Sequence, residues 1–236
     1  MADKVLEVEA LRAGYGPAEI LFGVSLKLAR GEVAALMGRN GAGKSTTLKA
    51  IMGLLPPRAG QVRFAGQEIA GLPAFRIARL GLGYVPEDRR IFTDLTVAEN
   101  LEVGRRAARG HAAWTPERLF EIFPNLAAMR GRRAAAMSGG EQQMLAIART
   151  LMGNPDAVLL DEPSEGLAPV ILELMAEAVL SMKREGIAVL LSEQNFDFAA
   201  AVADRAYVIE RGEIRYDGSM AALEADPALR ARHLTL

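Results

Sequence analysis

The chain has 236 residues, of which 50% are hydrophobic, and its formal net charge at pH 7 is -1. This composition allows a substantial hydrophobic core and gives no overall electrostatic reason to expect nucleic-acid binding. Because the sequence has no cysteine and only the two distant histidines His111 and His233, it excludes disulfides, thiolate zinc sites and cysteine nucleophiles, and a histidine-rich metal site is not expected.

Membrane-spanning and secretory segments are not expected either. No uninterrupted apolar run reaches the roughly 18 residues that a bilayer-spanning helix needs. Met1-Ala2-Asp3-Lys4 leads directly into an alternating strand pattern rather than into the apolar core of a signal peptide. These features predict a globular protein of the cytoplasm.

The first third of the chain is predicted to be mainly β-structure. Val5–Val8 and Val24–Leu28 alternate apolar and polar residues, as half-buried strands do. Val33–Met37 is instead a continuous apolar run, which is typical of a strand buried on both faces. A glycine-rich turn then precedes a helix over Lys44–Gly53, and a further strand is expected at Val62–Phe64.

The rest of the chain is predicted to alternate helices and strands. Residues 93–136 are rich in helix formers and arginine, and we expect a helical subdomain over 93–152, inserted in a single domain that covers 1–236. The elements that follow are a helix from Ser138, a strand at Ala157–Leu160, a helix from Ala168, a strand at Ile187–Leu191, a helix from Phe196 and a hairpin over Tyr207–Asp217 around Arg211-Gly212. This order predicts an α/β fold in which helices flank a mainly parallel sheet.

A glycine-rich loop between the buried strand and the first helix fits the P-loop pattern. It begins at Gly38 and ends in Gly43-Lys44-Ser45. Glycines let backbone N–H groups turn toward a polyphosphate, and the helix N-terminus attracts the same anion. Lys44 can then reach the β- and γ-phosphates, and the Ser45 hydroxyl can bind Mg²⁺. The alternative is an ordinary glycine turn, but the strand and helix on either side favour the phosphate site.

Two acids end the apolar strand at Ala157–Leu160. Asp161 and Glu162 would lie at the carboxyl edge of a parallel sheet, where such folds bind their ligands. Asp161 can hold Mg²⁺, directly or through water, and Glu162 can act as general base toward an attacking water. Two acids at a strand end are more often only a solvated terminus, but the upstream P-loop favours the metal site.

Between these motifs lies Met137-Ser138-Gly139-Gly140-Glu141-Gln142-Gln143, and here the chain resembles the ATP-binding cassette (ABC) family, whose signature is Leu-Ser-Gly-Gly-Gln. The resemblance covers essentially the whole chain. It implies a P-loop NTPase core with an N-terminal antiparallel β subdomain and an inserted helical subdomain. It also implies that the helix N-terminus at Ser138 serves the nucleotide of a second cassette, so that two chains enclose two ATP molecules. Taken alone, Ser-Gly-Gly would be a plain helix N-cap.

The resemblance implies ATP and Mg²⁺ as cofactors and assigns the site residues. Glu162, Lys44 and Gln194 are implied to be catalytic, and Ser45, Glu87 and Asp161 to bind Mg²⁺. ATP contacts are implied for Tyr15, Gly38, Arg39, Asn40, Gly41, Ala42, Gly43, Lys44, Ser45, Thr46, Ser138, Gly139 and Gly140.

Three positions depart from the family pattern. Glu87 replaces the usual Q-loop glutamine, Gln194 replaces the usual switch histidine, and Ala168 stands where the interface loop usually carries aspartate. A carboxylate can still approach Mg²⁺, and a glutamine amide can still donate a hydrogen bond to a γ-phosphate oxygen. Unlike histidine, however, glutamine cannot gain a proton near neutral pH.

The details of these motifs are similar to those of the ATPase subunits of branched-chain amino-acid importers. That resemblance implies an ATPase coupled to transport, peripheral on the cytoplasmic face of the inner membrane. Its implied partners are a second, different ATPase subunit, two membrane permease subunits and, indirectly, a solute-binding protein, with no nucleic acid. The alternatives are an exporter subunit, a purely regulatory nucleotide-binding module, and a non-transport cassette ATPase that acts on nucleic acid or ribosomes.

Overall fold

The computed structural model describes residues 4–108 and 113–233, so Met1-Ala2-Asp3 and His111 lie outside the described residues. The strands are β1 (Lys4–Tyr15), β2 (Ala18–Ala29), β3 (Val33–Met37), β4 (Ala59–Phe64), β5 (Gln67–Glu68), β6 (Leu82–Val85), β7 (Ala157–Asp161), β8 (Ala188–Glu193), β9 (Arg205–Glu210) and β10 (Glu213–Ser219). The helices are α1 (Lys44–Ile51), α2 (Ala74–Leu80), α3 (Val97–Gly104), α4 (Pro116–Ile122), α5 (Pro124–Ala128), the 3₁₀ turn η1 (Ala134–Ala136), α6 (Gly139–Leu151), α7 (Pro169–Arg184), α8 (Phe196–Val202), α9 (Met220–Ala225) and α10 (Pro227–His233).

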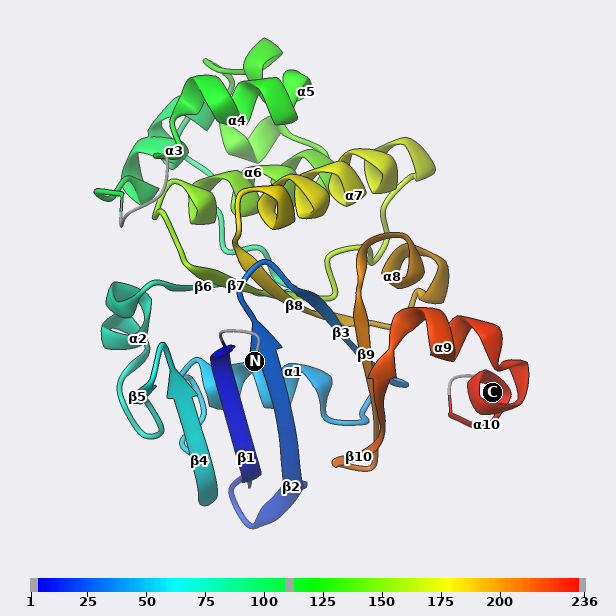
Figure 1. The fold of residues 1–236 in the computed structure, drawn as a ribbon. Helices are drawn as coiled ribbons and strands as arrows, with labels where there is room; N and C mark the ends of the chain where they lie inside the picture. The colour runs from blue at the N-terminus through cyan, green and yellow to red at the C-terminus, as the bar shows by residue number, and fades with distance from the viewer. Residues whose placement is uncertain (1–3, 109–112, 234–236) are drawn as a thin grey trace.

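The strands form two sheets (Figure 1). A four-stranded antiparallel sheet has the order β2-β1-β4-β5, and a six-stranded sheet has the order β10-β9-β3-β8-β7-β6. In the larger sheet β6, β7, β8, β3 and β9 run parallel, and β10 pairs antiparallel with β9. The predicted α/β class, with a mainly parallel sheet and an N-terminal antiparallel sheet, is therefore confirmed.

The central strands of the larger sheet are buried on both faces, which explains their continuous apolar runs. Alternate residues of β3 enter different cores: Val33, Ala35 and Met37 face one, and Ala34 and Leu36 face the other. Strands β7 and β8 alternate in the same way. Parallel strands in this position need apolar side chains on both faces, because helices or a second sheet cover each face.

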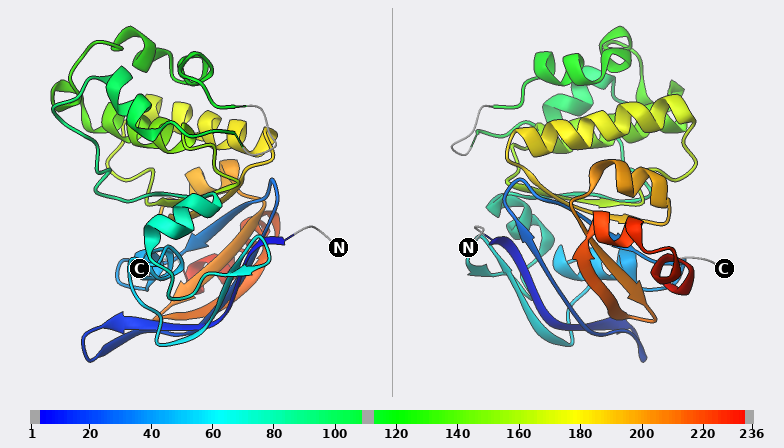
Figure 2. Two further views of the ribbon diagram at one scale, coloured as in Figure 1. Left: turned by 90° about the vertical axis from the view of Figure 1, so that its left-hand side faces the viewer. Right: turned by 45° about the vertical axis from the view of Figure 1, so that its right-hand side comes forward.

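Helices separate and cover the sheets (Figure 2). Helix α1 lies between them and contacts β1 and β2 on one side and β7 and β8 on the other. The helices α3 to α6 lie together above the larger sheet with α7. Leu101 of α3, Phe123 between α4 and α5, and Met144 of α6 belong to the same buried cluster as Val158 and Leu160 of β7. The helical region thus shares a core with the sheet, and the bounds 93–152 for a separate subdomain stay a prediction.

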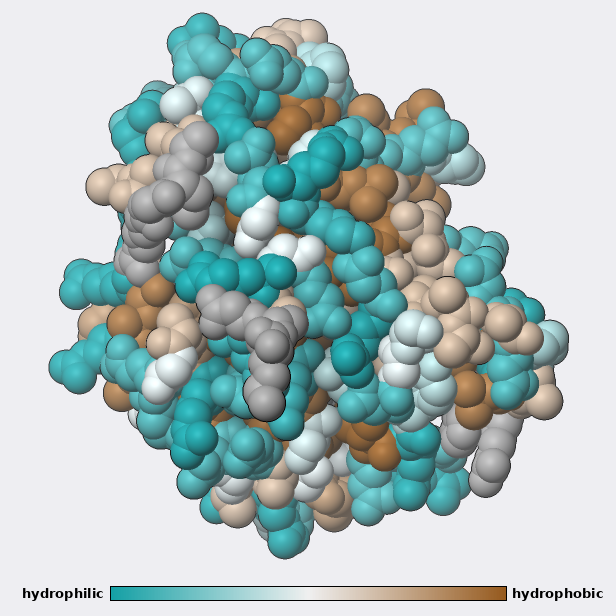
Figure 3. All heavy atoms as spheres, viewed as in Figure 1, coloured by the Kyte–Doolittle hydropathy of each residue, from teal (hydrophilic) through white to brown (hydrophobic). Residues whose placement is uncertain are grey.

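Helix α7 forms part of the outer surface. It contributes the partly buried residues Ile171, Leu172 and Leu180 to the core cluster. In Figure 3 apolar residues gather over this helix, whereas most of the same face is hydrophilic. No helix within the described ranges is both long and apolar enough to cross a lipid bilayer.

Several sequence-based boundaries need correction. The strand predicted at Val5–Val8 extends to Tyr15, because shifts of register near Ala10 interrupt the alternating pattern without ending the strand. The helix predicted to reach Gly53 ends at Ile51. Strands β5 and β6 and helices α2, α9 and α10 were not predicted at all. The three helices have six or seven residues, fewer than the roughly 11 over which a helical period becomes clear. The hairpin turn at Arg211-Gly212 is confirmed.

A buried tyrosine joins the two sheets. The Tyr207 hydroxyl, on β9, donates to the Lys27 carbonyl oxygen at 2.8 Å and accepts from the Lys27 N–H at 3.0 Å. Lys27 lies on β2, an edge strand of the smaller sheet, so the hydroxyl satisfies polar groups that the edge leaves open. The contact fixes one sheet against the other.

We predict that Tyr207→Phe lowers the free energy of unfolding by about 1–2 kcal/mol, because both backbone groups of Lys27 lose their partner. Tyr216→Phe is the matched control, since its hydroxyl donates only to the exposed Ser219 carbonyl, and it should change stability by less than about 0.5 kcal/mol. Urea unfolding measures both. Equal losses for the two variants would contradict the role given to Tyr207.

Candidate functional site

The glycine-rich loop joins β3 to α1 in a space that excludes side chains. A Cβ atom at Gly38 would lie 2.5 Å from the Ile209 carbonyl oxygen, so no larger residue fits there. Gly43 has φ 114°, a backbone conformation that glycine adopts readily and other residues avoid. The loop therefore brings its backbone N–H groups to the N-terminus of α1, where an anion is favoured.

Lys44 and Glu162 meet beneath this loop. The Lys44 ammonium donates to the carbonyl oxygens of Gly38 at 2.8 Å and Arg39 at 3.2 Å. It also lies 3.1 Å from Glu162 Oε1, and the two side chains are only 3% and 9% exposed. A buried carboxylate needs a compensating charge, and Lys44 supplies it here.

Gln194 completes the contacts of Glu162. Its side-chain amide nitrogen donates to Glu162 Oε2 at 2.9 Å and to Asn40 Oδ1 at 2.6 Å. The two oxygens of Glu162 therefore bind different partners, Lys44 and Gln194. The structure thus brings together all three residues that were predicted to be catalytic; their roles in catalysis stay predictions.

Asp161 has a separate set of partners, although it precedes Glu162 directly. It is 1% exposed, its Oδ1 accepts from the Ser192 hydroxyl at 2.8 Å, and its Oδ2 accepts from the Tyr84 hydroxyl at 3.1 Å. Burial and the nearby Asp161 charge raise the pKa of Tyr84 well above its usual value, so this hydroxyl remains a donor. The two acids at the end of β7 are thus held in different surroundings, which suits different roles.

A cavity of about 410 Å³ opens beside Lys44. Its lining contains Tyr15, Asn40, Gly41, Gly43, Lys44, Ser45, Thr46, Glu87, Glu162 and Glu165. Ile20 lines it as well. Nine of these eleven residues were predicted from sequence to form the nucleotide site, and the exceptions are Ile20 and Glu165. Glu165 lies in Ser164-Glu165-Gly166-Leu167, which matches the interface loop of the family. The volume lies in the range of cavities that hold small ligands.

A second cavity, of about 220 Å³, shares Glu87 with the first and reaches Asp161. Partial desolvation raises the pKa of Glu87, and the neighbouring carboxylates of Glu165, Glu162 and Asp161 raise it further. Mutual repulsion of carboxylates makes this region favourable for a cation. The oxygen donors Ser45, Glu87 and Asp161 are of the type that Mg²⁺ prefers.

Other predicted residues lie outside these cavities. Arg39 and Ala42 line a different hollow of about 230 Å³, together with Arg211. Ser138 is exposed and caps α6: its backbone N–H donates to Glu141 at 2.7 Å and its hydroxyl accepts from the Glu141 N–H at 3.4 Å. The plain N-cap is therefore present within one chain.

Gly139 and Gly140 follow Ser138 at the start of α6. A Cβ atom at Gly139 would lie 2.9 Å from the guanidinium of Arg89, and one at Gly140 would lie 3.0 Å from Ile171. Small residues therefore allow close contacts on both sides of this helix end. A role for Ser138, Gly139 and Gly140 at a partner's nucleotide stays a prediction.

Sequence reasoning missed Glu193, which ends β8 and is 2% exposed. Its carboxylate accepts from the Ser164 N–H at 3.0 Å, from the Ser164 hydroxyl at 2.8 Å, and from the N–H groups of Gln194 and Asn195 at 3.2 Å each. Burial raises the pKa of Glu193, although these hydrogen bonds oppose the shift. The residue ties the loop after Glu162 to the loop that carries Gln194. An acid that ends an apolar strand was the available signal, as it was at Asp161.

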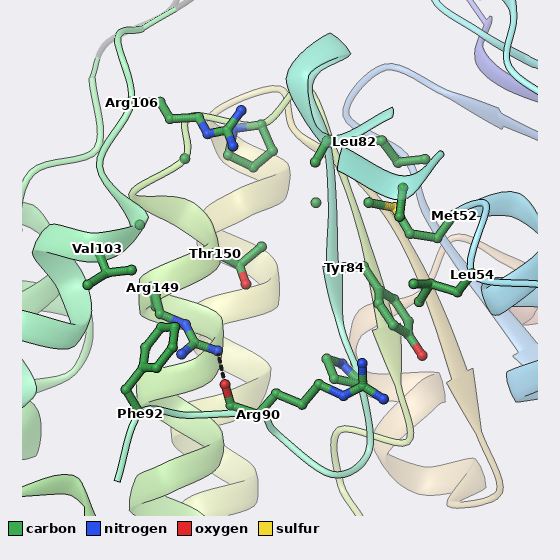
Figure 4. Close-up of a pocket in the computed structure, with 17 residues that line it drawn as sticks. Met52, Leu54, Leu82, Tyr84, Arg90, Phe92, Val103, Arg106, Arg149 and Thr150 are labelled. Carbon is green, nitrogen blue, oxygen red and sulfur yellow. Dashed lines mark hydrogen bonds between the residues drawn. The ribbon is translucent and has the colours of Figure 1, made fainter. Parts of the chain in front are cut away.

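A groove of about 410 Å³ lies between the helical region and β6 (Figure 4). It is lined by the exposed apolar residues Leu54, Phe92 and Val103 together with Tyr84, Arg149 and Thr150. Arg149 of α6 donates to the Arg90 carbonyl oxygen at 2.6 Å, and its guanidinium lies 5.0 Å from the centre of the Phe92 ring. Helix α6, which begins at the signature residues Ser138-Gly139-Gly140, is thus bound through Arg149 to the segment that follows Glu87. We call α6 the signature helix.

Known proteins resemble this chain in sequence. The family model described as ABC transporter matches residues 21–165. The high-affinity branched-chain amino acid transport ATP-binding protein BraG of Pseudomonas aeruginosa is 42% identical over 98% of this chain and 99% of its own length. The probable branched-chain amino acid transport ATP-binding protein LivF of Archaeoglobus fulgidus is 35% identical over 91% and 92%. The lipopolysaccharide export system ATP-binding protein LptB of Haemophilus influenzae is 32% identical over 98% and 97%.

Two solved structures agree with the fold. A nucleotide-free ATP-binding cassette from an ABC transporter is 28% identical, with a TM-score of 0.81 over 96% of this chain and 97% of that chain. The ADP conformation of another such cassette is 27% identical, with a TM-score of 0.80 over 96% of each chain. Likeness of this kind extends over nearly the whole chain.

We predict that Glu193→Gln exposes the backbone amide of Ser164 to faster hydrogen exchange. Oε2 of Glu193 accepts from the Ser164 hydroxyl and from the N–H groups of Gln194 and Asn195, whereas Oε1 accepts from the Ser164 N–H. A glutamine whose oxygen takes the place of Oε2 turns its NH₂ group, a donor, toward the Ser164 N–H. Unfolding free energy should fall by about 1–3 kcal/mol, the cost of a buried donor without a partner.

Ser164→Ala is the matched control, because it removes one hydroxyl and leaves the carboxylate of Glu193 with its backbone donors. It should cost about 0.5–1.5 kcal/mol and leave exchange at the backbone amide of residue 164 slow. Wild-type protection of this amide in Glu193→Gln would refute the assignment.

Proposed function

Because this chain belongs to the ABC transporter family of ATP-binding proteins, which hydrolyse ATP to power transport, we propose that it is the ATPase subunit of an importer for branched-chain amino acids or related small solutes. The identity of 42% with BraG along the full chain supports the choice of substrate class. The observation that carries the ATPase assignment is the meeting of Lys44, Glu162 and Gln194 beside the P-loop cavity.

Hydrolysis would follow from a change of partners at Lys44. A triphosphate carries more negative charge than Glu162, so it would draw the Lys44 ammonium away from that carboxylate. The freed carboxylate could then accept a proton from an attacking water. Gln194, already 2.9 Å from Glu162, would orient the water or donate to a γ-phosphate oxygen.

The residues at the acid edge fit Mg²⁺. The Ser45 hydroxyl and the carboxylates of Asp161 and Glu87 would hold it, directly or through water. When bound, Mg²⁺ neutralises developing negative charge on the phosphates. Glu87 adds a negative charge where the family usually has a neutral glutamine, so this chain would depend more strongly on a cation at the site.

Ser138 would act on a second cassette. Exposure of the α6 N-terminus supports this role, because an exposed helix start can meet the phosphate of a nucleotide held by another chain. ATP held between two chains would favour their closed dimer, and hydrolysis would remove the contact and loosen it. Tyr15, which is 48% exposed at the mouth of the cavity, would stack on adenine.

The groove in Figure 4 would receive a cytoplasmic segment of a membrane permease. Exposed apolar side chains on its walls and its position between α6 and β6 support this partner, since contact there would reach both the signature helix and the Glu87 loop. The complex would hold two permease subunits and work indirectly with a solute-binding protein. The chain would then lie peripherally at the cytoplasmic face of the membrane.

An exporter is the main alternative, because LptB at 32% identity is named for lipopolysaccharide export. The direction of substrate movement in vesicles that contain the purified transporter separates the two. A non-transport ATPase acting on nucleic acid or ribosomes has less support, given the net charge of -1. Salt-sensitive binding of DNA or RNA would favour it.

We predict that Glu162→Gln lowers the rate of ATP hydrolysis about 100-fold or more, because the general base is lost. ATP affinity should be kept or should tighten, since a carboxylate that competes for Lys44 is removed. Single-turnover phosphate release and equilibrium nucleotide binding measure the two effects separately.

Glu165→Gln is the matched control, because Glu165 lines the same cavity without an ion pair to Lys44. It should change the rate by less than about 5-fold, as expected for a screened charge. A wild-type rate in Glu162→Gln would mean that another group, or another protein, performs the hydrolysis.

We also predict that the partner cassette is a different chain. Glu87 and Gln194 both depart from the usual family residues, which is expected where two unlike cassettes share two composite sites. Mass spectrometry of the intact purified transporter should find one copy of this chain and one of a second ATPase. Two copies of this chain with no other ATPase would overturn the prediction.

A further inference from the structure

The groove and the metal-site cavity share a wall. Tyr84, Pro86 and Arg90 line both the groove of about 410 Å³ and the cavity of about 220 Å³ that contains Glu87 and Asp161. The two spaces have different parts in the proposed function, since the groove would receive the permease and the smaller cavity would hold Mg²⁺. Of the three shared residues, Tyr84 is the one whose hydroxyl bonds directly to Asp161.

The sheet places Tyr84 in both spaces. Strand β6 runs parallel to β7, and Tyr84 stands opposite Leu159, two residues before Asp161. Its hydroxyl donates to Asp161 Oδ2 at 3.1 Å. Its ring forms the groove wall across from Arg149 and Thr150 of α6 (Figure 4).

Asp161 is held from both neighbouring strands. Ser192 of β8 donates to Oδ1 at 2.8 Å, and Tyr84 of β6 donates to Oδ2. Asp161 is 1% exposed, so water cannot replace a lost donor easily. Hydrogen bonds of this kind fix the plane of a carboxylate that binds a metal, and their loss typically costs about 10–100-fold in metal affinity.

We propose that Tyr84 is a positioning residue that orients the Asp161 carboxylate for Mg²⁺ and thereby sets how much Mg²⁺ strengthens nucleotide binding. The inference rests on the proposed function, because it takes Asp161 to be a ligand of that metal. If Tyr84 had only a structural role, it would act through the packing of its ring in the wall of the groove and not through its hydroxyl.

Tyr84→Phe separates the two roles, since it keeps the ring and removes only the hydroxyl. The measurement is the equilibrium affinity for ADP, with Mg²⁺ and again with EDTA, which requires no turnover. We expect the ratio of the two affinities to fall about 10-fold in Tyr84→Phe, with the affinity in EDTA unchanged.

Two further variants test whether the effect is specific to the hydroxyl groups that donate to Asp161. Tyr207→Phe removes the hydroxyl of a tyrosine that is more buried than Tyr84 and lies on β9, four strands from β6 in the sheet order. Its Mg²⁺-dependent gain should match the wild type even though its stability falls. Ser192→Ala removes the other donor to Asp161 and should also reduce the gain, which keeps the test decisive if Tyr84→Phe folds poorly.

The outcomes separate a failure of the positioning role of Tyr84 from a failure of the proposed function. If the wild type gains affinity from Mg²⁺ and Tyr84→Phe gains just as much, the positioning role is overturned while the proposed function stands. If the wild type binds no nucleotide, or binds it equally with and without Mg²⁺, the metal site of the proposed function fails and the inference fails with it. A reduced gain confined to Tyr84→Phe and Ser192→Ala supports the proposal.

Discussion

The ion pair between Lys44 and Glu162 is the contact on which the rest of the site depends. It joins the start of α1 to the end of β7, two segments far apart in sequence, at a position where both side chains are nearly buried. The parallel order β3-β8-β7 makes this possible, because it brings the carboxyl ends of the three strands to one edge. With Lys44 also bound to the carbonyl oxygens of Gly38 and Arg39, the loop and the acid strand form one unit.

A set of hydrogen bonds extends from that pair to the loops around it. Gln194 connects Glu162 to Asn40, so the P-loop, the acid strand and the end of β8 are joined through one amide. Glu193 then joins Gln194 and Asn195, which follow β8, to Ser164 in the loop after Glu162. A ligand that displaced Glu162 from Lys44 would therefore disturb several segments at once, which suits a protein that converts nucleotide binding into movement.

The helical region meets the same site from the other side. Arg149 of α6 holds the carbonyl oxygen of Arg90, a residue whose φ of 47° is unusual for a side chain of this kind. Since α6 begins at Ser138, one helix connects the exposed signature end, the groove and the segment after Glu87. A partner that occupied the groove, as proposed, would therefore contact the same helix that begins at the exposed signature residues.

Local patterns in the sequence determined the buried strands at Val33–Met37 and Ala157–Leu160, the glycine-rich loop and the acids at strand ends, because period, glycine and charge act over a few residues. Strand β6 escaped prediction, since Gly83 interrupts its short apolar run. Only the tertiary structure decided that Glu162 contacts Lys44 and Gln194. It also decided that Asp161 contacts Tyr84 and Ser192, and that several N–H and O–H groups donate to the carboxylate of Glu193. These contacts depend on which strands lie next to one another in the sheet. The order of the strands is set by the packing of the whole fold rather than by residues adjacent in sequence.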